Sequence, residues 1–122
     1  MAYDKDNIFA KITRGEIPCK KVYEDDHVIA FHDVNPQTPV HVLVVPKGPY
    51  TSFDDFSQSA SDQEIVAFVR AVGKVASDLQ VSEAGYRILA NHGVDAHQEV
   101  AHFHMHIFAG RDLGRMIGPA EG

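Results

Sequence analysis

The chain has one cysteine and no tryptophan, and none of its apolar runs is long enough to cross a membrane. The lone cysteine, Cys19, excludes an internal disulfide, and we interpret it as a packing residue because it has no CxxC partner. Residues 1–6 lack the apolar core of a signal peptide. We therefore expect a cytoplasmic protein that has no membrane partner.

Positive charge is also scarce, because 17 Asp and Glu outnumber 11 Lys and Arg and leave a formal net charge of -6. Phosphate backbones are bound by basic surfaces, so this balance argues against a nucleic-acid polymer as the main partner. A small anion remains compatible, because histidines, backbone N–H groups or a few basic side chains can bind it locally. The 122 residues contain no repeat or linker, which indicates one domain over 1–122 with an irregular tail over about 110–122.

Histidine, in contrast, is frequent, and three of the eight alternate with apolar residues over 102–108. Strict alternation is the period of a half-buried strand, so His102, His104 and His106 are expected to share one face, about 6.5 to 7 Å apart. Near neutral pH a row of imidazoles offers a nucleophile, proton donors and hydrogen-bond donors. The stretch therefore predicts a catalytic site.

A zinc site is the alternative reading of the same residues. His-x-His on a strand lets two rings reach one ion, and a zinc hydrolase would use His102, His104 and His41. No cysteine or carboxylate follows His106 at a recognisable ligand spacing. We therefore favour chemistry that needs neither a metal nor a cofactor.

Hydrophobic periodicity predicts two helices and five strands. A short first helix, capped by Asp4 or Asp6, is expected to end before Gly15, and a capping box at residues 61–64 opens a long helix that runs to about residue 79. The expected strands cover residues 20–24, 28–32, 40–45, 86–90 and 102–108.

Two further polar residues stand out against their surroundings. His41 lies in a strand that is otherwise apolar on both faces, where a histidine is more often a satisfied core residue than a catalyst. Asp33 precedes an Asn-Pro pair, where an aspartate is about as often a turn cap as a ligand. Either residue becomes a stronger candidate for the catalytic site only if the fold places it beside His102, His104 and His106.

Residues 102–108 resemble the His-φ-His-φ-His-φ-φ signature of the histidine triad (HIT) superfamily, where φ is an apolar residue. The resemblance extends over essentially the whole chain and is to the nucleotide-binding, Hint-like branch. The segments that carry it, in order, are Ile8-Phe9 with Lys11-Ile12, Gly15-Glu16-Ile17-Pro18, Glu24-Asp25-Asp26, Ala30-Phe31-His32-Asp33, Pro39-Val40-His41 and Val45-Pro46-Lys47.

This resemblance implies an α+β fold with a five-stranded antiparallel sheet and two helices, the sheet being continued across a homodimer. It also implies hydrolysis of a purine nucleoside phosphoramidate of the AMP or GMP type. The reaction would pass through a nucleotidyl-histidine intermediate and release a nucleoside 5′-monophosphate.

The site residues implied by the resemblance form three groups. His104 is the expected nucleophile, supported by His102, His106 and His41, and Asp33 is the expected ribose-binding carboxylate. The remaining implied contacts are Ile8, Phe9, Ile12, Phe31, His32 and Val34 around the base, and Asn91, Gln98 and Glu99 in the loop beside the phosphate.

Two positions depart from the best-known members of the family. His97 stands where glycine is common, and Glu99 stands where a serine or threonine hydroxyl is usual. An ionised carboxylate only accepts hydrogen bonds, so Glu99 cannot replace that donor and repels a phosphate. The open alternatives are a dinucleoside polyphosphate hydrolase, a nucleotide-binding or sensing module, and the zinc hydrolase.

Overall fold

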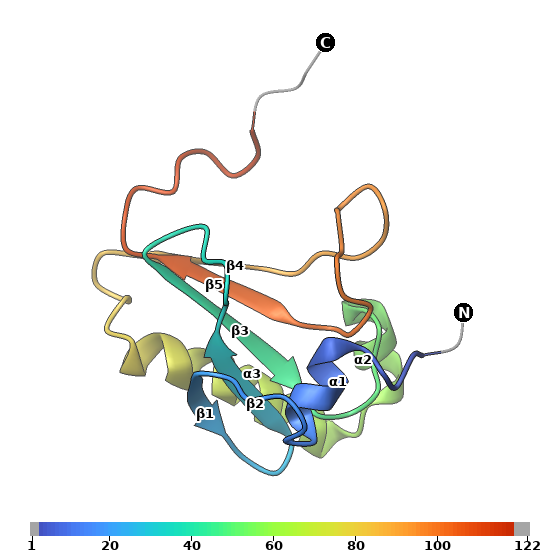
Figure 1. The fold of residues 1–122 in the computed structure, drawn as a ribbon. Coiled ribbons are helices and arrows are strands. Elements are labelled where there is room, and N and C mark those ends of the chain that lie inside the picture. The colour runs from blue at the N-terminus through green and yellow to red at the C-terminus, as the bar shows by residue number, and fades with distance from the viewer. Residues whose placement is uncertain (1–2, 119–122) are drawn as a thin grey trace.

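The computed structural model describes residues 3–118, which form a five-stranded antiparallel sheet in the order β1-β2-β3-β5-β4 with helices packed on it (Figure 1). This is the α+β, HIT-like fold expected from the sequence. The elements are α1 (Ile8–Thr13), β1 (Lys21–Glu24), β2 (Val28–His32), β3 (Val40–Pro46), α2 (Phe53–Ser59), α3 (Asp62–Asp78), β4 (Tyr86–Leu89) and β5 (Met105–Ala109).

The central strand β3 is buried on both faces, as its apolar sequence predicts. On one face, valines of β2 and β3 pack with Phe103, Ile107 and the apolar side of α3. On the other face, Phe9 and Ile12 of α1 cover Ile29, Phe31, Leu43 and Val45. In the β3–β5 ladder His41 pairs with Phe108 and Leu43 pairs with His106, so the histidines lie on the α1 side of the sheet.

Each of the three helices within residues 3–118 begins at a side-chain cap that accepts an N–H group of its first turn. The predicted capping box at Ser61 and Glu64 opens α3. The prediction of Asp4 or Asp6 as the cap of α1 was wrong, because Asn7 accepts the N–H of Ala10. The Asp4 carboxylate instead accepts the N–H of Asp6 in the preceding turn.

A third helix, α2, was not predicted from the sequence. Its seven residues, FDDFSQS, are too few and too polar to show a clear helical period, although Ser52 caps it by accepting the N–H of Asp55. Phe56 is the buried residue of this helix and packs against Phe68 and Phe103. Tertiary packing rather than periodicity therefore stabilises α2.

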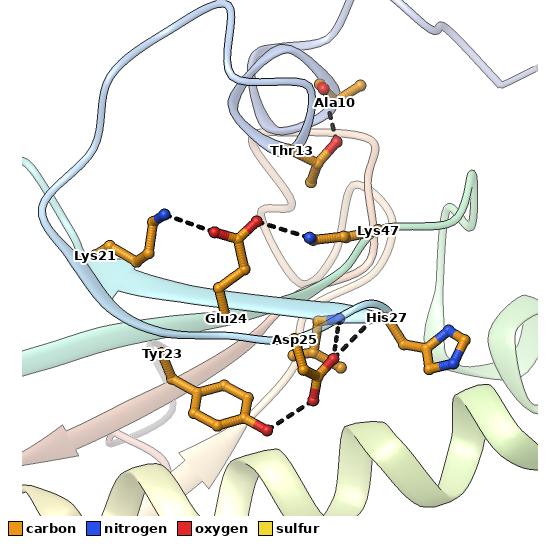
Figure 2. A network of polar contacts seen from close by, with 9 residues as sticks. Ala10, Thr13, Lys21, Tyr23, Glu24, Asp25, His27 and Lys47 are labelled. Carbon is orange, nitrogen blue, oxygen red and sulfur yellow. Dashed lines mark hydrogen bonds and ion pairs between the residues drawn. The ribbon is translucent and has the colours of Figure 1, made fainter.

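Polar side chains fix the turn between β1 and β2, as Figure 2 shows. Asp25 accepts the N–H groups of His27 and Val28 and the hydroxyl of Tyr23. Glu24 accepts from Lys21 at 2.5 Å and from Lys47 at 2.6 Å, and these two ammonium groups hold the pKa of Glu24 at about 2. The hairpin therefore holds β2, which ends directly before Asp33.

The segment after β5 has no helix or strand over residues 110–118, and residues 119–122 of the predicted tail lie outside the described residues. The Arg87 guanidinium holds this segment by donating to the carbonyls of Leu113, Gly114 and Arg115. No helix within residues 3–118 has both the length and the apolar character that a membrane span requires.

Candidate active site

The histidine segment does not form one continuous strand. β5 begins at Met105, so His102 and His104 precede the strand that was predicted over 102–108. The reason is that the N–H of Phe103 donates to the carbonyl of Tyr50 at 2.7 Å, in a loop rather than in the sheet. Even so, the rings of His104 and His106 lie 4.9 Å apart, and the rings of His106 and His41 lie 5.2 Å apart.

His102 is fully buried and both of its nitrogens are engaged. Nε2 lies 2.8 Å from the Pro46 carbonyl, which can only accept, so Nε2 carries the proton. Nδ1 is then the acceptor for the Tyr3 hydroxyl at 2.6 Å. Because burial lowers the pKa of His102 to about 4, the ring is neutral at neutral pH and acts as a fixed support.

His104 has one nitrogen available for chemistry. Its Nδ1 lies 2.7 Å from the carbonyl of His102 and must therefore donate, which leaves the lone pair on Nε2. Burial is the main cause that lowers the pKa of His104, and the ring packs edge-on against Phe9 at 4.7 Å between centroids. The arrangement holds an unprotonated imidazole with a free lone pair.

His41 and His106 form a directed pair. The N–H of Gln37 donates to Nδ1 of His41 at 3.1 Å, so we assign the proton of His41 to Nε2. That Nε2–H lies 2.9 Å from Nδ1 of His106, which accepts it and therefore carries its own proton on Nε2. Burial lowers the pKa of His106 to about 4, so His106 presents a neutral N–H donor beside His104.

Asp33 supplies the only acidic group in contact with this pair among the described residues. One of its oxygens accepts the N–H of Asn35 at 2.8 Å, which makes Asp33 a turn cap, and the other lies 3.4 Å from Nε2 of His41. Asp33 can therefore cap the turn and still bind a ligand, which are the two interpretations that the sequence left open. The side chain is 21% exposed and retains lone pairs that can accept further hydrogen bonds.

The predicted zinc ligands His102, His104 and His41 do not converge, because His102 is engaged by Tyr3 and Pro46. Within residues 3–118 the group with metal-ligand spacing is instead Asp33, His41 and His106, whose atoms lie within 4.8 Å of one another. A ligand imidazole must offer a lone pair, but Nε2 of His41 carries the proton that Gln37 fixes there. The hydrogen-bonding pattern thus fits proton donation better than metal binding.

Two hollows meet at Asp33. We name the larger, of about 750 Å³, the base hollow; it is lined by Pro18, Cys19, Lys20, His32, Asp33, Val34, Pro36, Pro39 and His41. We name the smaller, of about 180 Å³, the phosphate hollow; it is lined by Asp33, Gln37, Asn91, Ala96, His97, Gln98, Glu99, His104 and His106. The lone pair of His104 and the N–H of His106 belong to residues that line the phosphate hollow.

The residues expected around a base are divided between the surface and the core. His32 and Val34 line the base hollow, with Val34 98% exposed. Phe9 and Ile12 of α1 and Phe31 of β2 are buried where the helix packs on the sheet and line neither of these two hollows, and Ile8 is 48% exposed. Phe9 contacts the rings of His104 and Phe31, so this apolar cluster packs against the ring of His104 and helps to hold it in place.

The loop over 91–100 is held by Gln98 rather than left free. The carbonyl oxygen of its side chain lies 2.9 Å from Nδ1 of His92 and 3.3 Å from the N–H of Gly93, and its amide nitrogen donates to the carbonyls of Thr51 and Val100. Gln98, expected at the phosphate, therefore uses its side chain to shape the loop. Asn91 and Glu99, in contrast, line the phosphate hollow.

His97 adopts a backbone conformation with φ of 58°, in the left-handed region that favours glycine. This explains in physical terms why glycine suits the position and why a histidine there is strained. Sequence reasoning missed Gln37 and Tyr3, and only the proline-rich character of residues 33–39 could have drawn attention to Gln37.

Comparison with known proteins identifies the family of this chain. A family model described as the HIT domain matches residues 14–113. The chain belongs to the HIT family. The solved structure of a HIT family hydrolase from Clostridium thermocellum has a TM-score of 0.81 and 38% identity, and covers 93% of this chain and 98% of that one.

Other HIT relatives are similar over almost their whole length. A HIT-like protein of Azospirillum brasilense is 60% identical over 115 residues, which is 94% of each chain. The purine nucleoside phosphoramidase of Escherichia coli is 39% identical over 113 residues, covering 93% of this chain and 94% of that protein. The structure of a histidine triad protein from Clostridium difficile has a TM-score of 0.82 and 42% identity, and covers 95% of this chain and 100% of that one.

Proposed function

We propose that this HIT protein hydrolyses purine nucleoside phosphoramidates at the α-phosphate and releases a nucleoside 5′-monophosphate and an amine. The observation that carries the proposal is the free lone pair on Nε2 of buried, neutral His104, at a hollow that also presents the N–H of His106. The Escherichia coli relative bears the name of this activity, which supports the same assignment.

In the first step Nε2 of His104 attacks phosphorus, the P–N bond breaks, and the amine leaves with its electron pair and takes a proton from solvent. The His102 carbonyl accepts the Nδ1–H of His104 and so stabilises the positive charge that develops on the ring. In the second step water attacks phosphorus, loses a proton and releases the monophosphate from His104. Two displacements replace one difficult attack by water.

Neutral hydrogen-bond donors stabilise the negative charge on the phosphate. The Nε2–H of His106 is assigned to a nonbridging oxygen, because the hydrogen bond from His41 fixes that tautomer. Asn91 lines the same hollow and offers an amide donor. Asp33 is assigned to the ribose diol and the base hollow to the purine, with His32 and Val34 at its edge.

Incubation with adenosine 5′-phosphoramidate tests the function. We expect AMP release and, in rapidly quenched samples, an acid-labile nucleotide on the peptide that contains His104. His104→Ala should abolish both, since loss of a nucleophile costs more than the roughly 10²- to 10⁴-fold typical of a general acid or base. His27→Ala, in the β1–β2 turn, is the matched control.

A turnover that survives His104→Ala with a modest loss would contradict nucleophilic catalysis. Nucleotide affinity without turnover in the wild-type protein would instead favour a binding or sensing module. Turnover of diadenosine polyphosphate in preference to the phosphoramidate would favour the other hydrolase of the same superfamily.

We also propose that the protein is a homodimer whose sheet continues across the interface. β4 lies at one end of the sheet, and its Ile88 is 45% exposed on the same face as α3, where Val66 and Val69 are 50% and 64% exposed. An exposed apolar side chain at an open strand edge, with others on the helix that packs on the same face, is suited to contact with a second copy. Sedimentation should give a dimer that Ile88→Lys converts to monomer, while Lys74→Gln on the same helix should leave it dimeric.

A further inference from the structure

A third hollow adjoins the proposed active site. It has a volume of about 320 Å³, we name it the tail hollow, and its lining residues are Gln37, Thr38, Arg87, Leu89, Asn91, His106, Phe108, Arg111 and Leu113. Gln37, Asn91 and His106 also line the phosphate hollow, which in turn shares Asp33 with the base hollow. The phosphate hollow therefore adjoins both the base hollow and the tail hollow.

The charge of the tail hollow is opposite to that of its neighbour. Its lining residues include Arg87 and Arg111 and no acidic residue, whereas those of the phosphate hollow include Asp33 and Glu99. Asp112, which follows Arg111 in the sequence, lines a different hollow beside the same two arginines. Guanidinium groups in such a setting favour an anion with planar or tetrahedral oxygens.

The two arginines differ in how far they are engaged. Arg87 donates to the carbonyls of Leu113, Gly114 and Arg115 and so shapes the wall of the tail hollow. Arg111 is exposed and donates through one nitrogen to the carbonyl of Asp112. None of the ion pairs found within residues 3–118 includes either arginine, so Arg111 is the group suited to an incoming anion.

The residues that the hollows share indicate where each part of the substrate can bind. With the nucleoside in the base hollow and phosphorus beside His104, the group beyond the P–N bond needs space that adjoins the phosphate hollow. The tail hollow offers such space, because it adjoins the phosphate hollow at His106 and Asn91.

We propose that the tail hollow is the leaving-group subsite and that Arg111 selects substrates whose leaving group carries a negative charge. This inference rests on the proposed function and names its substrate class. The anion is either the carboxylate of an amino acid joined to phosphorus through its amine, or the phosphate of a polyphosphate chain, and both present oxygens to a guanidinium.

The experiment compares kcat/KM for three adenosine substrates, in which phosphorus is joined to glycine, to glycinamide or, in diadenosine triphosphate, to a phosphate chain. Glycine and glycinamide differ in the charge at one end and have similar size. We expect the glycine or the triphosphate substrate to exceed glycinamide by about tenfold, the size of a charge-assisted hydrogen bond at a partly exposed site. Which of the two gains identifies the source of the anion.

Arg111→Gln should reduce this ratio towards one, while Arg115→Gln, a neighbouring arginine outside the tail hollow, should preserve it. Thermal unfolding of both variants checks that the ratio is compared between folded proteins. A ratio near one in the wild-type protein, or a ratio that Arg111→Gln does not change, overturns the inference.

Measuring the binding affinity of the substrates gives a second test of the leaving-group subsite that does not depend on turnover. Calorimetric titration of His104→Ala with the adenosine phosphoramidates of glycine and glycinamide should show the same preference, again lost when Arg111→Gln is added. A preference in affinity without any turnover in the wild-type protein would sustain the subsite and overturn the proposed hydrolysis. Turnover without a preference in kcat/KM or in affinity would support the proposed hydrolysis and overturn the leaving-group subsite.

Discussion

At the scale of single residues, the site depends on which nitrogen of each histidine bears the proton. Carbonyl groups of His102 and Pro46 and the N–H of Gln37 determine this for His104, His102 and His41 in turn. Because backbone groups cannot exchange donor and acceptor roles, the tautomers are fixed before a substrate binds. Such preorganisation is what electrostatic catalysis requires.

Glu99 is the residue whose charge opposes the proposed chemistry. Its carboxylate lines the phosphate hollow with His104, and the substrate phosphate is also negative. Glu99→Gln removes this repulsion, so we expect KM for adenosine 5′-phosphoramidate to fall by roughly two- to fivefold, as for one exposed charge pair. Glu83→Gln, outside the hollow, is the control, and an unchanged or higher KM in Glu99→Gln would contradict the repulsion.

The sequence predicted by alternation that the triad rings share one side, and the rings of His102 and His104 both lie against Phe9 while the ring of His104 lies beside that of His106. It was not sufficient for their partners. Tyr3 and Pro46 are 99 and 56 residues away from His102 in the chain, and no local pattern connects them. The engagement of Gln98 by Thr51, 47 residues away, was hidden for the same reason.

At the scale of elements, α1 is the helix that covers the histidines. It has only six residues, too few to be stable alone, so its cap and its contacts with the sheet both matter. Phe9 on this helix contacts the ring of His104. The helix therefore connects local capping to the position of the proposed nucleophile.

The Asn7 side chain accepts the N–H of Ala10 at 2.8 Å and begins α1. Asn7→Ala should lower the free energy of unfolding by about 1 kcal/mol, the usual cost of losing an N-cap. Urea titration measures this change, with Asp6→Ala as the matched control because Asp6 does not cap the helix. Equal effects of the two substitutions would show that the cap is elsewhere.

Elements with strong local signals were predicted well and short ones less well. The capping box and apolar stripe of α3 are complete in the sequence, and the β1–β2 turn has its Asp25 acceptor in place. The start of β5 was misplaced because the N–H of Phe103 pairs with Tyr50 in a distant loop. Tertiary contacts of this kind override alternation at the end of a strand.

At the scale of the whole molecule, burying neutral histidines couples stability to pH. Burial lowers the pKa values of His102 and His106 from 6.5 to about 4, while in the unfolded chain they return towards 6.5. Between pH 6.5 and 4 the unfolded chain therefore binds protons that the folded protein does not. The contribution of these two histidines to the free energy of unfolding is fully present above pH 6.5 and decreases as the pH falls towards 4.

His102 provides the sharpest test, because it is fully buried in the structure and its ring bonds to Tyr3 and Pro46. Its share of the loss in the free energy of unfolding between pH 7 and pH 4 should be on the order of 3 kcal/mol, because its pKa is about 4 in the folded protein and 6.5 in the unfolded chain. Urea titrations at several pH values give the free energy of unfolding as a function of pH. The slope of this free energy against pH should be smaller for His102→Gln than for the wild-type protein, whatever the absolute stability of the variant. His27→Gln, in the β1–β2 turn, should keep the wild-type slope, and a His102→Gln slope equal to that of the wild-type protein would contradict the coupling.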